Sequence, residues 1–406
     1  MTAAALPSRD GSPLYISSHG DSTDPVFKSG LPYHLLHEAM RQGFAAGALP
    51  LLSASAPSYR LKRAAWNLRR VAAGHRRGGF VYSPQGMETL WKPVRNGFGD
   101  VRIVHIYQLM APSVIDERAP RTWFYIDMTL HQLFGSVYEP RRLRDIFAEA
   151  LALERRCYAA AAGVITRSQW AAASVIADCG VSPAKVHVVL PGANLDPHAY
   201  EAWDRAEKEQ RGRVPEQERN AQPVRFVYVG YDWKRKGLDR LLRALTIARG
   251  RGAQATLRVI GCERDDLPQE LRDTAGVEWC GVVSKREAPA RFLQLVAECD
   301  VGCLPSWVEG AGIALREFAA LGLAVLATTQ GGSPENAPSG ASVLIAPSAD
   351  DAELADVMYR LTVEDEWRES LRGCAWERRR SYLWQRSVAQ LAEIVDAGAE
   401  RLASAV

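Results

Sequence analysis

The sequence predicts an α/β protein built from two domains. Strand-like and helix-like segments alternate from Leu14 onward, which is the pattern of a parallel sheet covered by helices. A charged stretch over residues 201–222 interrupts this alternation, and a second α/β series starts abruptly at Arg225–Gly230. The chain of 406 residues is also too long for one ordinary hydrophobic core. These observations together predict two similar halves.

The first half contains short apolar runs of the length expected for buried strands. The predicted strands are Leu14–Ser17, Phe80–Tyr82, Val101–Tyr107, Trp123–Ile126, Gly163–Thr166 and Val186–Leu190. Helices are predicted at His34–Gln42, where Gly43 provides the stop signal, and at Arg142–Cys157. The first half is therefore an α/β unit.

The second half repeats the alternation more regularly. Its predicted strands are Phe226–Val229, Leu257–Ile260, Val277–Cys280, Val301–Leu304, Ala324–Ala327 and Ser342–Ile345. Its predicted helices are Gly237–Arg249, Ala288–Glu298, Ile313–Leu321 and Ala352–Leu361, and residues 365–406 continue as an arginine-rich helical segment. Glu201–Gln222 is dense in charge and lacks an apolar stripe, so it is predicted to be a solvated linker or insertion.

Bulk properties narrow the class of protein. A net charge of +3 is too small to argue for nucleic-acid binding. The seven cysteines are an odd number without a CxxC pair, which favours reduced thiols in a cytoplasmic protein. Met1–Asp10 has no apolar core of a secretion signal, and no run reaches the ~20 apolar residues of a membrane-spanning helix. The acid pairs at residues 265–266 and 350–351 look like helix-start acids, so no metal site is predicted.

The segment from Val301 to Val325 carries the first functional signal. A predicted strand, a loop with Gly310 and Gly312, and a helix follow one another, and the free N–H groups of such a helix N-terminus attract an anion. Glu317 projects from a helix that is apolar nearly all round, where a bare carboxylate would cost several kcal/mol. Either sugar hydroxyls or a core arginine would satisfy it.

The loop after the predicted strand Phe226–Val229 carries the second signal. Gly230 ends the strand, Tyr231 follows, and Arg235 and Lys236 precede the helix that starts at Gly237. Phosphate binding uses this arrangement because Lys supplies a point charge and Arg a planar fork. The alternative is a solvated turn with three exposed cations.

The spacing of Glu309 and Glu317, the run AALGLAV after them and the later turn Gly331–Glu335 resemble the retaining nucleotide-sugar glycosyltransferases of family 4. This resemblance implies the GT-B fold, in which two Rossmann-like domains face a central cleft. It also implies an acceptor domain over residues 1–200, a linker over 201–222 and a nucleotide-sugar domain over 223–375, with a helix over about 376–406 that packs back on the first domain.

The resemblance also implies roles for single residues. Glu309 would contact hydroxyls of the donor sugar, Glu317 would hold the ribose, and Lys236 would neutralise the leaving phosphate. Tyr231 stands where the family often has arginine, so Arg235 is the candidate replacement. The other residues expected at the donor site are Gly230, Tyr231, Val282, Val283, Gly310, Ala311, Gly312, Ile313, Ala314 and Gly30.

The first half would hold the acceptor. Gly30 lies in a loop that corresponds to the family's glycine loop, and Asp127 stands at a strand end where many relatives have histidine. Asp127 could instead cap the following helix. The basic stretch Tyr59–Arg77 has helical periodicity, so it could contact anionic lipids, although a solvated cationic face is the favoured interpretation.

We therefore expect a retaining, metal-independent glycosyltransferase without a cofactor, active in polysaccharide or glycoconjugate synthesis. Its partners would be a nucleotide-sugar donor and a glycan or lipid-linked acceptor, with peripheral membrane contact through Tyr59–Arg77 as an alternative to a purely cytoplasmic location. A sugar phosphorylase or nucleotide-sugar epimerase on the same scaffold, or a non-catalytic nucleotide-sugar-binding protein, remain the alternative functions.

Overall fold

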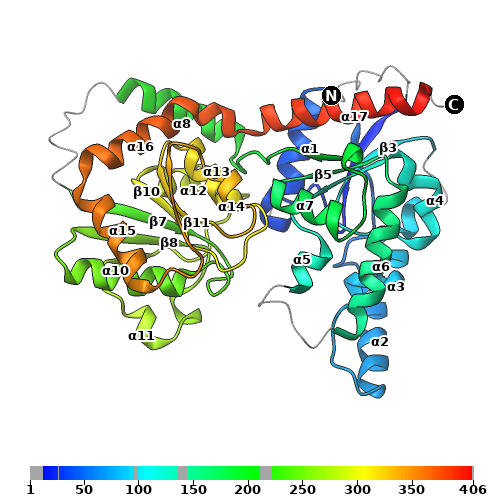
Figure 1. Cartoon of the computed structure of the whole chain (residues 1–406), viewed down its shortest axis with the longest axis horizontal. Helices are drawn as coiled ribbons and strands as arrows, with labels where there is room; N and C mark the ends of the chain where they lie inside the picture. The colour runs from blue at the N-terminus through cyan, green and yellow to red at the C-terminus, as the bar shows by residue number, and fades with distance from the viewer. Residues whose placement is uncertain (1–11, 26, 96–98, 136–143, 211–221, 405–406) are drawn as a thin grey trace. The chain divides into compact units, whose positions relative to one another are not determined.

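The chain forms two compact units, each built on one parallel sheet. The computed structural model describes residues 12–25, 27–95, 99–135, 144–210 and 222–404. Unit 1 comprises Met1–Leu190 with Trp384–Val406, and unit 2 comprises Pro191–Leu383. Each sheet has six strands, and helices cover both of its faces (Figure 1). The predicted α/β class and the two-domain organisation are confirmed.

The sheet of unit 1 has the strand order β2-β1-β3-β4-β5-β6. Its strands are β1 (Leu14–Ser18), β2 (Gly47–Ala48), β3 (Arg102–Ile106), β4 (Thr122–Ile126), β5 (Gly163–Thr166) and β6 (Val186–Val188). Chain order reverses between β1 and β3, which pair in parallel with Ile16 opposite Val104. Loops that follow these two strands therefore meet at the carboxyl edge of the sheet.

Eight helices and several short 3-10 turns accompany this sheet in the described part of unit 1. The helices are α1 (Leu31–Arg41), α2 (Pro57–Ala72), α3 (Pro84–Trp91), α4 (Ile115–Arg118), α5 (Leu130–Gly135), α6 (Arg144–Ala160), α7 (Gln169–Ala177) and α17 (Trp384–Ser404). Side chains of Ser83 and Ser168 cap α3 and α7 by accepting from Gly86 N and Ala171 N. Helix α17 is held by an ion pair between Arg102 and Asp396 at 2.8 Å.

The sheet of unit 2 has the order β12-β11-β10-β7-β8-β9. Its strands are β7 (Val224–Val229), β8 (Ala255–Ile260), β9 (Val277–Trp279), β10 (Val301–Leu304), β11 (Ala324–Thr328) and β12 (Ser342–Ile345), as predicted to within two residues at each end. Strands β7 and β10 are neighbours at the centre, and chain order reverses between them. This reversal is the point at which open α/β sheets bind ligands.

Helices pack on both faces of this second sheet. They are α8 (Pro197–Gln210), α10 (Leu238–Gly250), α11 (Gln269–Arg272), α12 (Pro289–Ala297), α13 (Ile313–Ala320), α14 (Ser333–Asn336), α15 (Asp351–Val363) and α16 (Asp365–Arg378). Phe226 and Tyr228 of β7 share one core cluster with α10 and α15. Val227 points to the other face and joins the cluster of α12 and α13, because side chains alternate along a strand.

The predicted strand Phe80–Tyr82 is wrong, because these residues form a 3-10 turn. Phe80 is buried in the core of unit 1. The turn starts after Gly79, which has a left-handed backbone, and ends at Ser83, so the segment is only three residues long. The Ser83 hydroxyl donates to Phe80 O at 2.8 Å and accepts from Gly86 N at 3.0 Å. The aromatic and β-branched side chains signalled a strand, whereas local hydrogen bonds impose a turn.

The predicted linker Glu201–Gln222 is also corrected in its described part, because α8 continues to Gln210. Tyr200 and Asp204 are the buried residues of α8 in its described part. The carboxylate of Asp204 accepts hydrogen bonds from Arg379 and Arg380 of a 3-10 turn, η9 (Arg379–Tyr382). Helix α8 is thus held by polar partners far away in sequence, together with the apolar contacts of Tyr200 and Trp203. Residues 211–221 lie outside the described residues.

Both ends of unit 2 are tied to α13 through one side chain. Arg316 is buried, donates from Nε to Pro191 O at 3.0 Å, and lies over the Tyr382 ring at 4.9 Å. The backbone adds a hydrogen bond from Ala193 N to Tyr382 O at 2.7 Å. The segments by which the chain enters and leaves unit 2 thus lie side by side against α13.

Candidate functional site

The loops after β7 and β10 form the candidate site of unit 2. Both strands end at the same edge of the sheet, so residues 230–237 and 305–312 lie beside each other. The backbone joins the loops through a hydrogen bond from Trp307 N to Arg235 O at 2.8 Å. A third loop contributes Gly332 N, which donates to Glu309 O at 3.2 Å.

Two glycines allow this close packing. A Cβ atom at Gly230 would lie 2.6 Å from Cδ of Lys236, so a side chain there would displace the lysine. Gly237 has φ +74°, and a Cβ atom would lie 2.1 Å from Pro305 O. Gly230 thus leaves room for the Lys236 side chain, and Gly237 allows the β7 loop to approach the β10 loop.

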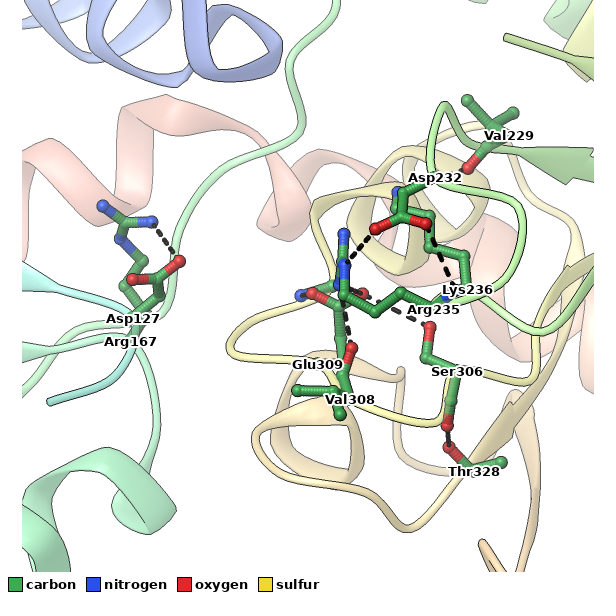
Figure 2. Close-up of polar contacts among 11 residues, drawn as sticks. Asp127, Arg167, Val229, Asp232, Arg235, Lys236, Ser306, Val308, Glu309 and Thr328 are labelled. Atoms are coloured by element: carbon green, nitrogen blue, oxygen red, sulfur yellow. Dashed lines mark hydrogen bonds and ion pairs between the residues drawn. The ribbon is translucent and has the colours of Figure 1, made fainter. Parts of the chain in front are cut away.

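Arg235 links the two loops (Figure 2). Its guanidinium donates to Val308 O at 2.8 Å, lies 3.6 Å from Oε2 of Glu309, and pairs with Asp232 at 3.3 Å. The side chain is 29% exposed, so part of the guanidinium still faces solvent. Arg235 therefore fixes the loop geometry and leaves a cationic edge available to an anion.

Lys236, unlike Arg235, has no close anionic partner among the described residues. Its Nζ atom lies 3.5 Å from Val229 O, and within the described ranges no carboxylate reaches ion-pair distance. Burial lowers the pKa of Lys236, and Glu309 only partly opposes this shift. The nearby cations Arg235 and Lys285 lower the pKa further. An ammonium group with three donors and one weak contact can still bind an anion.

Glu309 is nearly buried and already accepts hydrogen bonds from the β10 loop. Its Oε1 atom accepts from Gly312 N at 3.1 Å, and Oε2 accepts from the Ser306 hydroxyl at 3.3 Å. Thr328 in turn donates to Ser306 O at 2.8 Å (Figure 2). A carboxylate has about four acceptor positions, so Glu309 can accept from a further hydroxyl while it holds the loop.

The residues around the N-terminus of α13 form the wall of this site. Gly312 is the N-cap, with φ +67° and no capping side chain of its own. Gly310, Ala311 and Ala314 are buried, and Ile313 is partly exposed. The positive end of the helix dipole therefore lies where the β10 loop ends, and this loop contacts the loop that carries Lys236.

Glu317 has a cationic partner that sequence reasoning missed. Its Oε1 atom forms a short ion pair with Nζ of Lys285, whose ammonium also lies over the Phe292 ring at 4.3 Å. Glu317 is 2% exposed and Lys285 19% exposed. A lysine rather than the suggested core arginine thus satisfies the buried carboxylate. Lys285 follows the predicted donor-site residues Val282 and Val283, so its position shortly after a strand end was the available signal.

The remaining predicted donor-site residues are exposed or engaged by neighbours. Tyr231 is 74% exposed and Val282 is 60% exposed, while Val283 is partly buried. The Val282 N–H donates to Glu263 at 3.1 Å. Glu263 is a second residue that the sequence did not indicate.

In unit 1 the loop before α1 contains strained backbone. Lys28 and Ser29 have φ +48° and +58°, a conformation that non-glycine residues rarely adopt, and Gly30 follows at +81°. The Lys28 ammonium lies 5.3 Å from the centre of the Tyr107 ring. This loop follows β1, and Tyr107 follows β3, so both lie at the reversal point of the first sheet.

Asp127 follows β4 and forms an ion pair with Arg167 at 3.6 Å (Figure 2). Thr129, not Asp127, caps α5, since the Thr129 hydroxyl accepts from Gln132 N at 3.2 Å. Partial burial would raise the pKa of Asp127, but Arg167 and Lys28 hold it below its ordinary value. Arg167 follows β5, so its place at a strand end could have identified it.

Other ionisable groups have structural partners. His105 is buried between Ser17 and Leu109, and burial lowers its pKa to about 4, as befits a core histidine. The seven cysteines are free thiols. Asp350 caps α15, and Asp266 shares a capping box with Glu263. Throughout the described ranges, no three potential metal ligands cluster and no helix is both long and apolar enough to cross a membrane.

Comparison with known proteins shows the family of the chain. Two family models match it, "Glycosyltransferase Family 4" over residues 33–197 and "Glycosyl transferases group 1" over residues 223–363. The D-inositol 3-phosphate glycosyltransferase of Corynebacterium jeikeium is 26% identical over 223 residues, which are 52% of this chain and 51% of that protein. The chain thus spans about half the length of the curated relatives it matches.

Solved structures extend the similarity over nearly the whole chain. Sucrose-phosphate synthase from Thermosynechococcus elongatus has a TM-score of 0.66 and 18% identity, with 97% of this chain and 100% of that chain covered. Anabaena Alr3699/HepE in complex with UDP-glucose has a TM-score of 0.60 and 15% identity, with 96% and 99% covered. These identities establish a shared fold, and the family matches establish descent. The chain belongs to the family 4 glycosyltransferases and has the GT-B fold.

Proposed function

We propose that the protein is a retaining glycosyltransferase that moves a sugar from a nucleotide-sugar donor to a glycan or lipid-linked acceptor, as polysaccharide and glycoconjugate synthesis requires. The observation that carries this proposal is the Lys236 ammonium, which has no carboxylate partner among the described residues and lies at the reversal point of the second sheet, in the same loop region as Glu309 and the N-terminus of α13. A diphosphate would complete the coordination of these groups.

The names of similar proteins support the kind of donor. Anabaena Alr3699/HepE is described in complexes with UDP and with UDP-glucose, and several curated relatives are named as D-inositol 3-phosphate glycosyltransferases. We assign the donor to unit 2 on this basis, together with the cationic loop.

The proposed chemistry is mainly electrostatic. The bond between the anomeric carbon and the diphosphate breaks, the acceptor's hydroxyl oxygen bonds to that carbon, and the hydroxyl proton passes to the departing diphosphate. Lys236, Arg235 and the first turn of α13 stabilise the charge that develops on the departing oxygen. Glu309 orients the sugar through its hydroxyls. These groups supply the required positive charge, so the proposal assigns no step to a metal or cofactor. Proton NMR of the product's anomeric centre tests retention.

The acceptor is assigned to unit 1. Asp127, held by Arg167, presents a carboxylate at the carboxyl edge of the first sheet, and the strained loop Phe27–Gly30 lies at the same edge. Such a carboxylate can orient a sugar hydroxyl, and the loop can change conformation when substrates bind.

Replacement of Glu309 by glutamine tests the catalytic assignment. The amide keeps an acceptor for Gly312 N, so the fold should persist, but the charge that orients the sugar is lost. We expect both sugar transfer and slow donor hydrolysis to fall by roughly a hundredfold. Release of nucleoside diphosphate measures both reactions, and Glu366→Gln, an exposed site on α16, should retain wild-type rates.

Equal rates in Glu309→Gln and wild type would remove Glu309 from the mechanism. A chain that binds UDP-, GDP- and ADP-sugars but releases no diphosphate with any of them would be a binding protein. Release of sugar that requires inorganic phosphate and no acceptor would instead identify a phosphorylase.

The role of Glu317 can be tested through the ribose. If its carboxylate accepts from the ribose hydroxyls, wild type should bind UDP at least about tenfold more tightly than 2′-deoxy-UDP. Glu317→Gln should largely abolish this preference, whereas Lys285→Met should retain it because the carboxylate remains. Calorimetric titration of both nucleotides measures the difference.

A purely structural ion pair gives a different result. Glu317→Gln and Lys285→Met would then lower the melting temperature alike, the double variant would recover part of the loss, and the preference for UDP would be the same in every folded variant.

A further inference from the structure

Helix α2 of unit 1 packs through one face only. Tyr59 is buried against Phe80 at 5.1 Å between ring centres, and Trp66 lies 5.8 Å from the same ring. Arg70 pairs with Asp145 at 2.7 Å. Spacings of seven and four residues place these three side chains on one side of a helix. This face accounts for the attachment of α2 to its unit.

The opposite face is apolar and exposed. Leu61 and Leu68 are each 73% exposed, and Val71 is 48% exposed. The exposed stripe comprises Leu61, Ala64, Ala65, Leu68, Val71 and Ala72. Single exposed apolar residues are ordinary, but six on one helical stripe form a contiguous patch of the kind that marks an interaction surface. Figure 1 shows α2 at the outer edge of unit 1, beside α3.

Positive charge surrounds this stripe. Arg60 and Arg63 lie on one flank, Lys62 and Arg69 on the other, and all four are exposed. Arg76 and Arg77 follow the helix and are also exposed. The sequence has no Asp or Glu between Glu38 and Glu88, so no acid of this segment offsets the charge.

We propose that α2 lies on an anionic lipid surface. The stripe from Leu61 to Ala72 would enter the boundary between head groups and acyl chains, and the flanking cations would contact anionic head groups. An exposed apolar face between two basic flanks is the arrangement of interfacial helices. Membrane binding through α2 does not depend on the donor chemistry. It would, however, bring the enzyme close to a lipid-linked acceptor.

A second copy of the chain fits this surface less well. A twofold contact through the stripe would set α2 against α2 and bring the basic flanks of both copies together. Like charges that face each other across an interface oppose association. An anionic membrane satisfies the apolar stripe and the cations at once.

The test is co-sedimentation of the full chain with vesicles of phosphatidylcholine, alone or mixed with phosphatidylglycerol. Wild type should bind the anionic vesicles, and added salt should weaken binding. The double variant Leu61→Asp/Leu68→Asp should bind at least about tenfold more weakly. Arg60→Glu and Arg69→Glu should each cost about fivefold or more.

Matched controls lie outside α2. Val363→Asp changes a 50% exposed apolar residue of α15, and Arg386→Glu changes an exposed cation of α17. Both should leave vesicle binding unchanged. Melting temperatures and UDP binding equal to those of wild type would show that the α2 variants fold and that the donor site is intact.

Two results would overturn the proposal. One is wild-type protein that stays in solution with anionic vesicles or binds them as well as Leu61→Asp/Leu68→Asp does. The other is a wild-type dimer in light scattering that this double variant converts to a monomer, because a second copy would then cover the stripe.

Discussion

Replacement of Lys236 by methionine should lower the rate of sugar transfer by about a hundred- to a thousandfold. The lysine is the one cation of the β7 loop that points into the site without an ion-pair partner in the described parts of the chain, so its charge remains available to the leaving diphosphate. Loss of one preorganised donor at a developing anion typically has an effect of this size. Steady-state kinetics with saturating nucleotide sugar measures it.

Lys234 provides the matched control. It lies in the same loop, is exposed, and places its ammonium 5.1 Å from the centre of the Trp233 ring. Lys234→Met should change the rate less than about twofold, as expected for a solvated cation. If both variants lose activity equally, the loop contributes only diffuse positive charge and Lys236 has no special role.

Replacement of Asp204 by alanine should destabilise unit 2 by roughly 3–5 kcal/mol. The carboxylate is 1% exposed, and it accepts from Arg379 and Arg380 at 2.6 Å each and from Lys208 at 2.9 Å. Arg379 is itself only 9% exposed and would lose its anionic partner. The free energy of unfolding in urea, followed by circular dichroism, measures the loss.

The neighbouring pair of Glu201 and Arg380 is the control for this effect. Both side chains are about half exposed, at 50% and 51%, so Glu201→Ala should cost no more than about 1 kcal/mol. A loss of similar size in both variants would mean that burial does not strengthen the Asp204 cluster.

The pH dependence of the free energy of unfolding tests the Asp204 cluster independently. Burial alone would raise the pKa of Asp204, but hydrogen bonds from Arg380, Lys208 and Arg379 hold it well below its ordinary value of 3.8. A lowered pKa in the folded state stabilises at pH values above the ordinary pKa, and this contribution is lost as pH falls toward the folded pKa. The difference between wild type and Asp204→Ala should therefore shrink below about pH 4.

The strands of unit 2 could be predicted because buried parallel strands are continuous apolar runs with clear ends. Prediction failed where distant partners decide the outcome. Residues 201–210 look solvated in isolation, yet Asp204 gains its partners Arg379 and Arg380 from a segment near the other end of the unit. Phe80–Tyr82 failed for a local reason, because Ser83 closes a turn within three residues.

The candidate site was predictable to the extent that strand ends identify it. Lys236 and Glu309 follow strands that the sequence predicts within the same half, and the structure pairs these strands and brings their loops into contact. The partner of Glu317 depends on where the Lys285 side chain turns, which no spacing rule gives. Similarly, the sequence indicates that α2 is a helix, but only packing shows which of its two apolar faces is covered.

The return of α17 to unit 1 has a consequence for protein engineering. Unit 2 is one uninterrupted piece of chain, Pro191–Leu383, whereas unit 1 is made from two pieces. Truncation after residue 383 would therefore damage unit 1, because Asp396 would no longer pair with Arg102 and Gly398 would no longer lie against the Trp123 ring. Unit 2 transferred to another protein as residues 191–383 would keep Pro191, Arg316 and Tyr382. It would therefore retain the contacts that hold its two ends side by side.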